Sequence, residues 1–220
     1  MKRIEEVYFI DKNNAPQPHT IIENTIYKQN GYRLTHFSMG AGTSCSPERF
    51  HHLAIYTCNV GEVHIQVYEK DKTYKEIVLR PGDFWIRPCQ TLCGLYVNVD
   101  TVFTIMRLRY TTNLIDTLHI GDTGTFLKHS EIKESQVVEK RIINDQFFTM
   151  DILTFGKNSR FEIEEDRNMI FSVLEGKCAI LHCDKTMHME VNQSFHTFRH
   201  GKTVVVCATE AKVVLLSFLN

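Results

Sequence analysis

The feature that most constrains this chain is an internal repeat, in which matching pieces recur in one order about 110 to 116 positions apart. Glycines follow matching apolar runs at Gly40 and Gly156 and at Gly61 and Gly176, and an Asp-Lys-Thr tripeptide occupies residues 71–73 and 184–186. Phenylalanines on returning strands, Phe84 and Phe195, and the apolar tails VFTIMRL and VVLLSFL both recur at a spacing of 111. One recurring tripeptide carries little information, but an ordered series indicates a duplicated unit. The repeat therefore predicts two homologous domains.

Hydrophobic residues alternate with polar ones in short runs, and long helical patterns are scarce. In the run from Val63 to Tyr68, valine and isoleucine occupy every second position, and His64, Gln66 and Tyr68 fill the others. Turn residues interrupt such runs about every 8 to 12 positions, as in antiparallel sandwiches and barrels. The sequence therefore predicts an all-β fold.

Composition excludes several classes of partner. The 220 residues include 25 basic and 26 acidic side chains, so no excess of positive charge points to nucleic acid. No apolar stretch reaches the ~18 residues of a membrane-spanning helix, and the first residues do not form a signal peptide. The seven cysteines include no CxxC pair, which favours reduced thiols and a cytoplasmic location.

Two segments resemble motifs of the cupin superfamily. LRPGDFWIRPCQTLC is similar to the second cupin motif, and IFSVLEGKCAI is similar to the strand that opens the central hairpin. The resemblance implies two tandem antiparallel cupin-type (double-stranded β-helix or jelly-roll) barrels, a bicupin. We expect a first barrel over residues 1–112, a connector over 113–130 and a degenerate second barrel over 131–220. A segment near the second start, SEIKESQVVEKRII, reads as a short helix or as a first strand.

The resemblance also implies a divalent metal (Zn, Fe, Mn or Ni) at the barrel mouth, held by a His-x-His pair, a Glu and a later His. The second domain has lost this pattern. Its first motif offers only the acids Glu162, Glu164 and Glu165, and the later His falls near Thr203. His196 and His200 lie four positions apart, too far along a strand to share one ion. We therefore expect no metal in the second domain.

The first domain keeps a partial set. The His-x-His positions fall near Glu48 and Phe50, His51 and His52 follow, and the later His position falls on Cys93. Cysteine is a good zinc ligand, so Glu48, one of the two histidines and Cys93 form a candidate metal set. Adjacent histidines on a regular strand point to opposite faces, so only one of them faces the cavity. The alternative is that Cys93 only fills the space of a lost histidine.

Trp85, Arg87 and Tyr56 are the candidate ligand-binding residues. Trp85 and Arg87 share one face of a strand, and an aromatic ring beside a guanidinium suits a small acid or sugar. The alternative is a packing role, in which the indole lies at the surface against the arginine stem or anchors an interface between the two barrels.

Three hypotheses for function remain open at this point. The first is a protein that binds a small polar metabolite in the first barrel. The second is a metal-dependent isomerase, epimerase or dioxygenase with its site in that barrel. The third is a structural module, because cupin sheets often pair between subunits, which would make a homodimer. Fold does not decide among them, and the sequence names neither ligand nor reaction.

Overall fold

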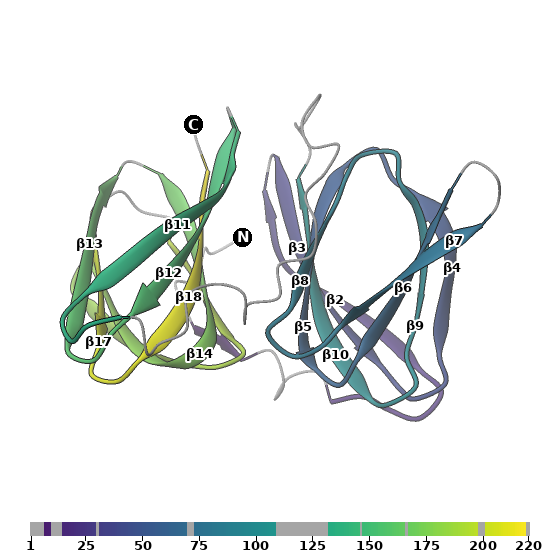
Figure 1. Cartoon of the computed structure of the whole chain (residues 1–220), viewed down its shortest axis with the longest axis horizontal. Coiled ribbons are helices and arrows are strands. Elements are labelled where there is room, and N and C mark those ends of the chain that lie inside the picture. The colour runs from purple at the N-terminus through teal and green to yellow at the C-terminus, as the bar shows by residue number, and fades with distance from the viewer. Residues whose placement is uncertain are drawn as a thin grey trace. The chain divides into compact units, whose positions relative to one another are not determined.

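The computed structural model describes residues 7–9, 15–29, 31–69, 73–108, 132–145, 147–165, 167–197 and 201–218. Every regular element in these ranges is a β-strand, which confirms the all-β prediction (Figure 1). Within the same ranges no helix has the length and apolar character needed to cross a bilayer. The predicted connector, residues 113–130, lies outside the described residues.

The chain divides into two compact units. We call residues 15–108 the N-terminal barrel, and residues 132–218 together with the strand β1 (Val7–Phe9) the C-terminal barrel. Although β1 comes first in the sequence, it pairs with β16 (Gln193–Thr197) of the C-terminal barrel, with Phe9 opposite Gln193. The described start of the chain is therefore part of the later unit, whereas the sequence analysis assigned it to the first domain.

The N-terminal barrel consists of a five-stranded sheet, β2-β3-β10-β5-β8, and a four-stranded sheet, β4-β9-β6-β7. All its described strand pairs are antiparallel. The strands are β2 (Ile21–Gln29), β3 (Tyr32–Met39), β4 (Ser44–Arg49), β5 (Leu53–Val60), β6 (Val63–Tyr68), β7 (Tyr74–Leu79), β8 (Phe84–Arg87), β9 (Leu92–Tyr96) and β10 (Thr101–Leu108).

The C-terminal barrel is a single nine-stranded sheet with the main order β1-β16-β14-β18-β12-β11, to which β13, β15 and β17 add a second layer. The further strands are β11 (Val137–Asn144), β12 (Phe148–Phe155), β13 (Ser159–Glu165), β14 (Asn168–His182), β15 (Lys185–Glu190), β17 (Gly201–Cys207) and β18 (Ala211–Phe218). The segment from residue 137 is thus a strand and not a helix.

The two barrels have the same strand order. The order β2-β3-β10-β5-β8 corresponds to β11-β12-β18-β14-β16, and β4-β9-β6-β7 corresponds to β13-β17-β14-β15, because the long strand β14 takes the places of both β5 and β6. Asp184 lies in the turn between β14 and β15, and Thr73 precedes β7 in the equivalent hairpin. Asp71 and Lys72 lie outside the described residues, so the equivalence of the two tripeptides stays a prediction.

The structure corrects the register of the repeat by one residue in its second half. At Gly61 an added Cβ would meet Asp100 O and the Thr101 backbone, and at Gly176 it would meet Glu210 O and the Ala211 backbone. Thr101 therefore corresponds to Ala211, a spacing of 211 − 101 = 110 where the sequence alignment used 111. Since a slip of one residue moves every side chain to the other face, this changes which residues correspond.

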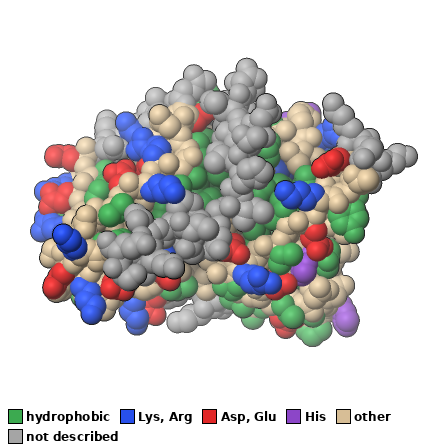
Figure 2. All heavy atoms as spheres, viewed as in Figure 1, with side chains coloured by type: hydrophobic (Ala, Val, Ile, Leu, Met, Phe, Trp, Pro, Cys, Tyr) green, Lys and Arg blue, Asp and Glu red, His purple; other side chains and the backbone are tan. Residues whose placement is uncertain are grey.

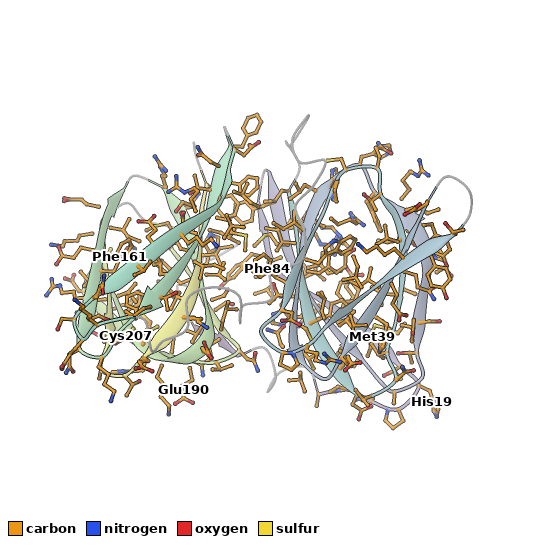
Figure 3. All side chains as sticks on the ribbon, in the orientation of Figure 1. His19, Met39, Phe84, Phe161, Glu190 and Cys207 are labelled. Atoms are coloured by element: carbon orange, nitrogen blue, oxygen red, sulfur yellow. The ribbon has the colours of Figure 1, made fainter. Side chains whose placement is uncertain are left out.

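The corrected register pairs Trp85 with Phe195, where the sequence analysis matched Phe84 with Phe195. Trp85 lies opposite Tyr56, and Phe195 lies opposite Phe171. Phe171 corresponds to Tyr56 because the two are 115 positions apart, which is also the spacing of Gly61 and Gly176. Each barrel closes its own core, and Met39 and Cys207 are fully buried members of the two cores (Figure 3).

Candidate functional site

Strand β8 points Trp85 and Arg87 into the N-terminal barrel. It pairs with β5 so that Tyr56 lies opposite Trp85 and Ala54 lies opposite Arg87. Tyr56, Trp85, Ala54 and Cys93 all belong to the buried core of this barrel. The packing alternative of a surface tryptophan is therefore not observed, because the Trp85 side chain is buried within its own barrel.

Aromatic rings pack around Arg87. The ring centroids of Tyr56 and Trp85 are 5.4 Å apart with tilted planes. Burial raises the pKa of the Tyr56 phenol well above its usual value; the Cys93 thiol raises it further, and the Arg87 charge opposes the rise. The phenol is therefore neutral at physiological pH and can accept a hydrogen bond.

Arg87 is fully buried, with 0% of its surface exposed. Its Nη1 donates to Tyr56 Oη at 3.3 Å and lies 3.8 Å from Cys93 Sγ, and its Nη2 donates to the His52 carbonyl oxygen at 3.2 Å. The guanidinium carbon lies 4.7 Å from the centre of the Phe50 ring. All of these partners are neutral groups, so the contacts orient the guanidinium without neutralising its charge.

No carboxylate among the described residues pairs with Arg87, and its Nε is buried without a hydrogen-bond partner. A guanidinium has five N–H donors, and the three recorded contacts use three of them. The two that remain belong to Nε and Nη2, which lie on one edge of the group. That edge matches the two oxygens of a carboxylate. A buried and unpaired cation is costly, so this edge is the strongest indication of a ligand in the barrel.

A second arginine, Arg107 on β10, lies near the aromatic rings of Phe50 and Phe37. Its guanidinium carbon is 5.3 Å from the Phe50 ring centre and 6.0 Å from the Phe37 ring centre. Its Nη1 lies 3.8 Å from Glu23. Burial lowers the pKa of Arg107, Glu23 opposes this shift, and the nearby charge of Arg87 adds to it. Phe50 thus lies close to two cations, and the interior here is positive.

The structure does not assemble the predicted metal set. Glu48 lies opposite Cys93 in the β4–β9 ladder, but its side chain is exposed. His51 is also exposed and its Nδ1 contacts Gln90 Nε2 at 2.5 Å, while His52 contributes its carbonyl oxygen to Arg87. Within the described ranges no three His, Cys, Asp or Glu side chains converge as a metal site.

A metal at Cys93 also fits poorly for an electrostatic reason. The Cys93 sulfur lies 3.8 Å from Arg87 Nη1, so a divalent ion on the thiolate would be held beside a buried guanidinium. Two like charges at such a separation repel strongly in a medium of low dielectric. The residues present therefore fit an anion at this position, and they do not fit a metal ion.

The equivalent positions of the C-terminal barrel hold other side chains. Thr203 corresponds to Cys93 at the corrected spacing of 110, and Ile163 lies opposite Thr203 as Glu48 lies opposite Cys93. Thr197 corresponds to Arg87, and its hydroxyl accepts a hydrogen bond from the Met169 amide at 2.9 Å. Glu162 and Glu164 are exposed, and Glu162 pairs with Arg160 and Lys202. His200 lies outside the described residues.

Charged side chains of both signs are interspersed over the face shown in Figure 2. Arg33 pairs with Glu23 and Arg80 with Glu62 in the N-terminal barrel, and Lys177 pairs with Glu190 in the C-terminal barrel. Exposed pairs of this kind add little stability. The unpaired charge of Arg87 in the interior stands apart from this pattern.

No protein-family model and no curated protein matches the sequence. Solved structures do match: a cupin 2 conserved barrel domain protein from Leptotrichia buccalis has a TM-score of 0.79 at 14% identity and covers 99% of this chain and 98% of its own. The chain has the cupin fold. Protein Ylba of E. coli matches with a TM-score of 0.68 at 7% identity over 97% of this chain and 90% of its own. A mutant oxalate decarboxylase of Bacillus subtilis matches with a TM-score of 0.61 at 7% identity over 99% of this chain and 78% of its own.

The structure brings together Trp85, Arg87 and Tyr56, the residues that the sequence predicted for ligand binding, and adds Arg107, which the sequence did not predict. Arg107 follows Phe103 and Ile105 at alternate positions of β10, and both of these residues belong to the core. The same alternation directs Arg107 inward, so the spacing of Arg107 from Phe103 and Ile105 is the sequence signal that predicts its inward position. The position of Phe50 beside the guanidinium groups of both Arg87 and Arg107 depends on the three-dimensional arrangement and has no signal in the sequence.

Proposed function

We propose that this cupin-fold protein binds a small organic carboxylate in its N-terminal barrel, with Arg87 as the group that holds the acid. The observation that carries the proposal is the fully buried Arg87 guanidinium, which has no carboxylate partner in the described chain and a free donor edge at Nε and Nη2. A carboxylate on that edge would supply the missing charge and both missing acceptors.

The surrounding residues have supporting roles in the proposal. Tyr56 and His52 fix the plane of the guanidinium, Phe50 and Trp85 supply apolar walls, and Arg107 adds a second positive charge. The metal-enzyme hypothesis has less support because the same positive charges oppose a cation at Cys93. The oxalate decarboxylase is named for a small acid, but a likeness at 7% identity carries the fold alone and adds nothing on the ligand.

Calorimetric titration with acetate, malonate, succinate and citrate, alongside phosphate and glucose, tests the proposal. We expect at least one carboxylate to bind and to change the fluorescence of Trp85, the single tryptophan of the chain. Arg87→Lys should weaken that binding by about 10- to 100-fold, because the ammonium lacks the planar fork and a charge-assisted bond contributes about 1.5–3 kcal/mol.

The matched control is Arg80→Lys, the same change at an exposed arginine of the same barrel. This variant should bind as the unchanged protein does. The proposal fails if no carboxylate of the panel binds in the millimolar range, or if Arg87→Lys and Arg80→Lys bind equally well.

A further inference from the structure

The C-terminal barrel contains a pocket of its own, with a volume of about 220 Å³. It opens between β11, β12, β13 and β18, and Phe161, which is labelled in Figure 3, forms part of its wall. The lining residues are Glu139, Arg141, Thr149, Asp151, Phe161, Glu162, Ile163, Glu164, Arg167, Leu215 and Ser217. All of them belong to the C-terminal barrel, so this pocket is independent of the Arg87 site.

Three buried polar side chains reach this pocket. Asp151 and Ser217 are exposed by 2% and 3%, and Thr149 by 4%, although all three line the cavity. Arg141 Nε donates to one oxygen of Asp151 at 2.5 Å. Among the described residues, the second Asp151 oxygen has no recorded partner, and the hydroxyls of Thr149 and Ser217 have no recorded hydrogen bond. All three residues line the cavity, so their free hydrogen-bonding groups are available to a molecule bound there.

The lining is rich in both donors and acceptors and has no dominant sign of charge. Four carboxylates face two arginines, but Glu162 is already paired with Arg160 and Lys202, and Glu139 lies 3.5 Å from Arg141. An anion would meet the carboxylates, and a cation would meet the arginines. Hydroxyl groups both donate and accept, so a neutral polyhydroxylated molecule satisfies the hydroxyls, Asp151 and the arginines together.

The apolar part of the pocket fits the same class of ligand. Phe161, Ile163 and Leu215 supply its apolar lining, and an aromatic face suits the carbon–hydrogen side of a sugar ring. The volume is below the ~300 Å³ at which pockets for drug-sized molecules begin, so one ring fills it. From this geometry we infer that the C-terminal barrel binds a neutral polyol or monosaccharide, with Asp151, Thr149 and Ser217 as its polar contacts.

Saturation-transfer NMR and calorimetry of the full chain with glucose, galactose, mannose, myo-inositol and the disaccharide maltose test this inference. We expect one of the single-ring compounds to bind, and Thr149→Val and Ser217→Ala each to weaken it about 3- to 10-fold. Since neither hydroxyl has a recorded partner in the free protein, both variants should keep or raise the unfolding temperature. Asp151→Asn should weaken binding further, and Arg87→Lys should leave it unchanged.

Thr186→Val, the same change at an exposed threonine of this barrel, is the matched control and should bind normally. Tighter binding of maltose than of any single-ring compound would indicate that the pocket binds the terminal sugar of a longer glycan, and it would still support a sugar site in this barrel. Three results would overturn the inference: no compound of the panel binding below about 20 mM, Thr149→Val and Thr186→Val binding alike, or putrescine or acetate displacing the sugar from the pocket.

Discussion

The two barrels share a strand order, yet their interiors carry opposite polar groups at corresponding positions. Arg107 of the N-terminal barrel corresponds to Ser217, at the spacing of 110, and Thr35 corresponds to Asp151, at the spacing of 116 that separates Gly40 from Gly156. The N-terminal interior therefore holds cations and the C-terminal interior holds a carboxylate. The comparison teaches that this fold specifies where inward side chains lie and leaves their chemistry to individual positions.

A second difference concerns volume at one cross-strand pair. In the N-terminal barrel the large Arg87 lies opposite the small Ala54, and in the C-terminal barrel the small Thr197 lies opposite the large Met169. Each pair combines a large and a small residue, so the core is filled in both cases, as close packing requires. Arg87 thus has a space that its counterpart lacks.

The largest expected effect comes from placing the N-terminal residue in the C-terminal barrel. Thr197→Arg should lower the free energy of unfolding by more than about 4 kcal/mol, because the new guanidinium would be buried against the large Met169 side chain. It would also lack the hydrogen bond that Arg87 makes to the Tyr56 hydroxyl, since the corresponding residue here is Phe171. Urea denaturation followed by far-ultraviolet circular dichroism reports on both barrels, and Trp85 fluorescence reports on the N-terminal barrel alone.

Two companion variants sharpen this comparison. Thr197→Val removes the hydrogen bond that the hydroxyl accepts from the Met169 amide and the longer one that it donates to the Met169 carbonyl oxygen, and should cost about 1–2 kcal/mol. Thr197→Arg combined with Met169→Ala restores the space seen at Ala54 and should recover part of the loss. If the Thr197→Arg protein were as stable as the Thr197→Val protein, the C-terminal barrel would accommodate a buried arginine at this position as the N-terminal barrel does, and the proposed difference between the two interiors would be wrong.

The corresponding glycines provide a test of intermediate size. Gly61 and Gly176 have positive φ angles of 77° and 74°, and an added Cβ would lie 2.4 Å and 2.2 Å from a backbone oxygen. Alanine at either position should cost about 2–4 kcal/mol, combining left-handed backbone strain with overlap. Gly61→Ala should shift the Trp85 transition, and Gly176→Ala should shift the dichroism.

Gly42→Ala is the control for backbone strain without overlap. Its φ is 76°, and nothing lies within 4 Å of the added carbon, so a cost of only about 1 kcal/mol is expected. If Gly61→Ala cost no more than Gly42→Ala, the close approach that aligns the two barrels would be absent in solution.

The smallest effect concerns alkaline pH. Burial raises the pKa of the Cys58 thiol from its ordinary value of 9.0 to about 12, and the charge of Asp83 adds to the rise. Above pH 9 the unfolded chain releases this proton while the folded protein keeps it, so stability present below pH 9 is lost as the pH rises toward 12. The slope approaches about 1.4 kcal/mol per pH unit.

Cys58→Val gives the N-terminal barrel the residue of its counterpart, Val173, at the spacing of 115. The variant should match the unchanged protein at pH 7 and exceed it by about 1 kcal/mol at pH 10, as measured by urea denaturation with Trp85 fluorescence. Equal stability curves from pH 7 to pH 10 would contradict a buried, proton-retaining thiol at this position.

The sequence predicted the strands because alternation is a local property, but it did not predict their correspondence between the barrels. Strand β8 reads Phe-Trp-Ile-Arg, with apolar residues on both faces, so its phase cannot be taken from hydrophobicity. Matching Phe84 to Phe195 by residue type then put the second half of the repeat one position out of register. The cross-strand partners Tyr56 and Phe171 decide the correct match.

The candidate site could be predicted only in part for a related reason. That Trp85 and Arg87 share a face follows from strand geometry, and the structure places both side chains inside the N-terminal barrel. The missing counter-charge of Arg87 cannot be read from the sequence, because it depends on which acids from distant strands turn away. Glu48 illustrates this point, since it lies opposite the core residue Cys93 and yet is exposed.

The pairing of β1 with β16 has a consequence for protein synthesis. About 180 residues separate Phe9 from Gln193, and ribosomes add roughly 5–20 residues per second, so the early strand waits about 10–40 s for its partner. The complete N-terminal barrel leaves the ribosome during that interval. The middle of the chain is therefore free to fold while its described start still has no strand to pair with.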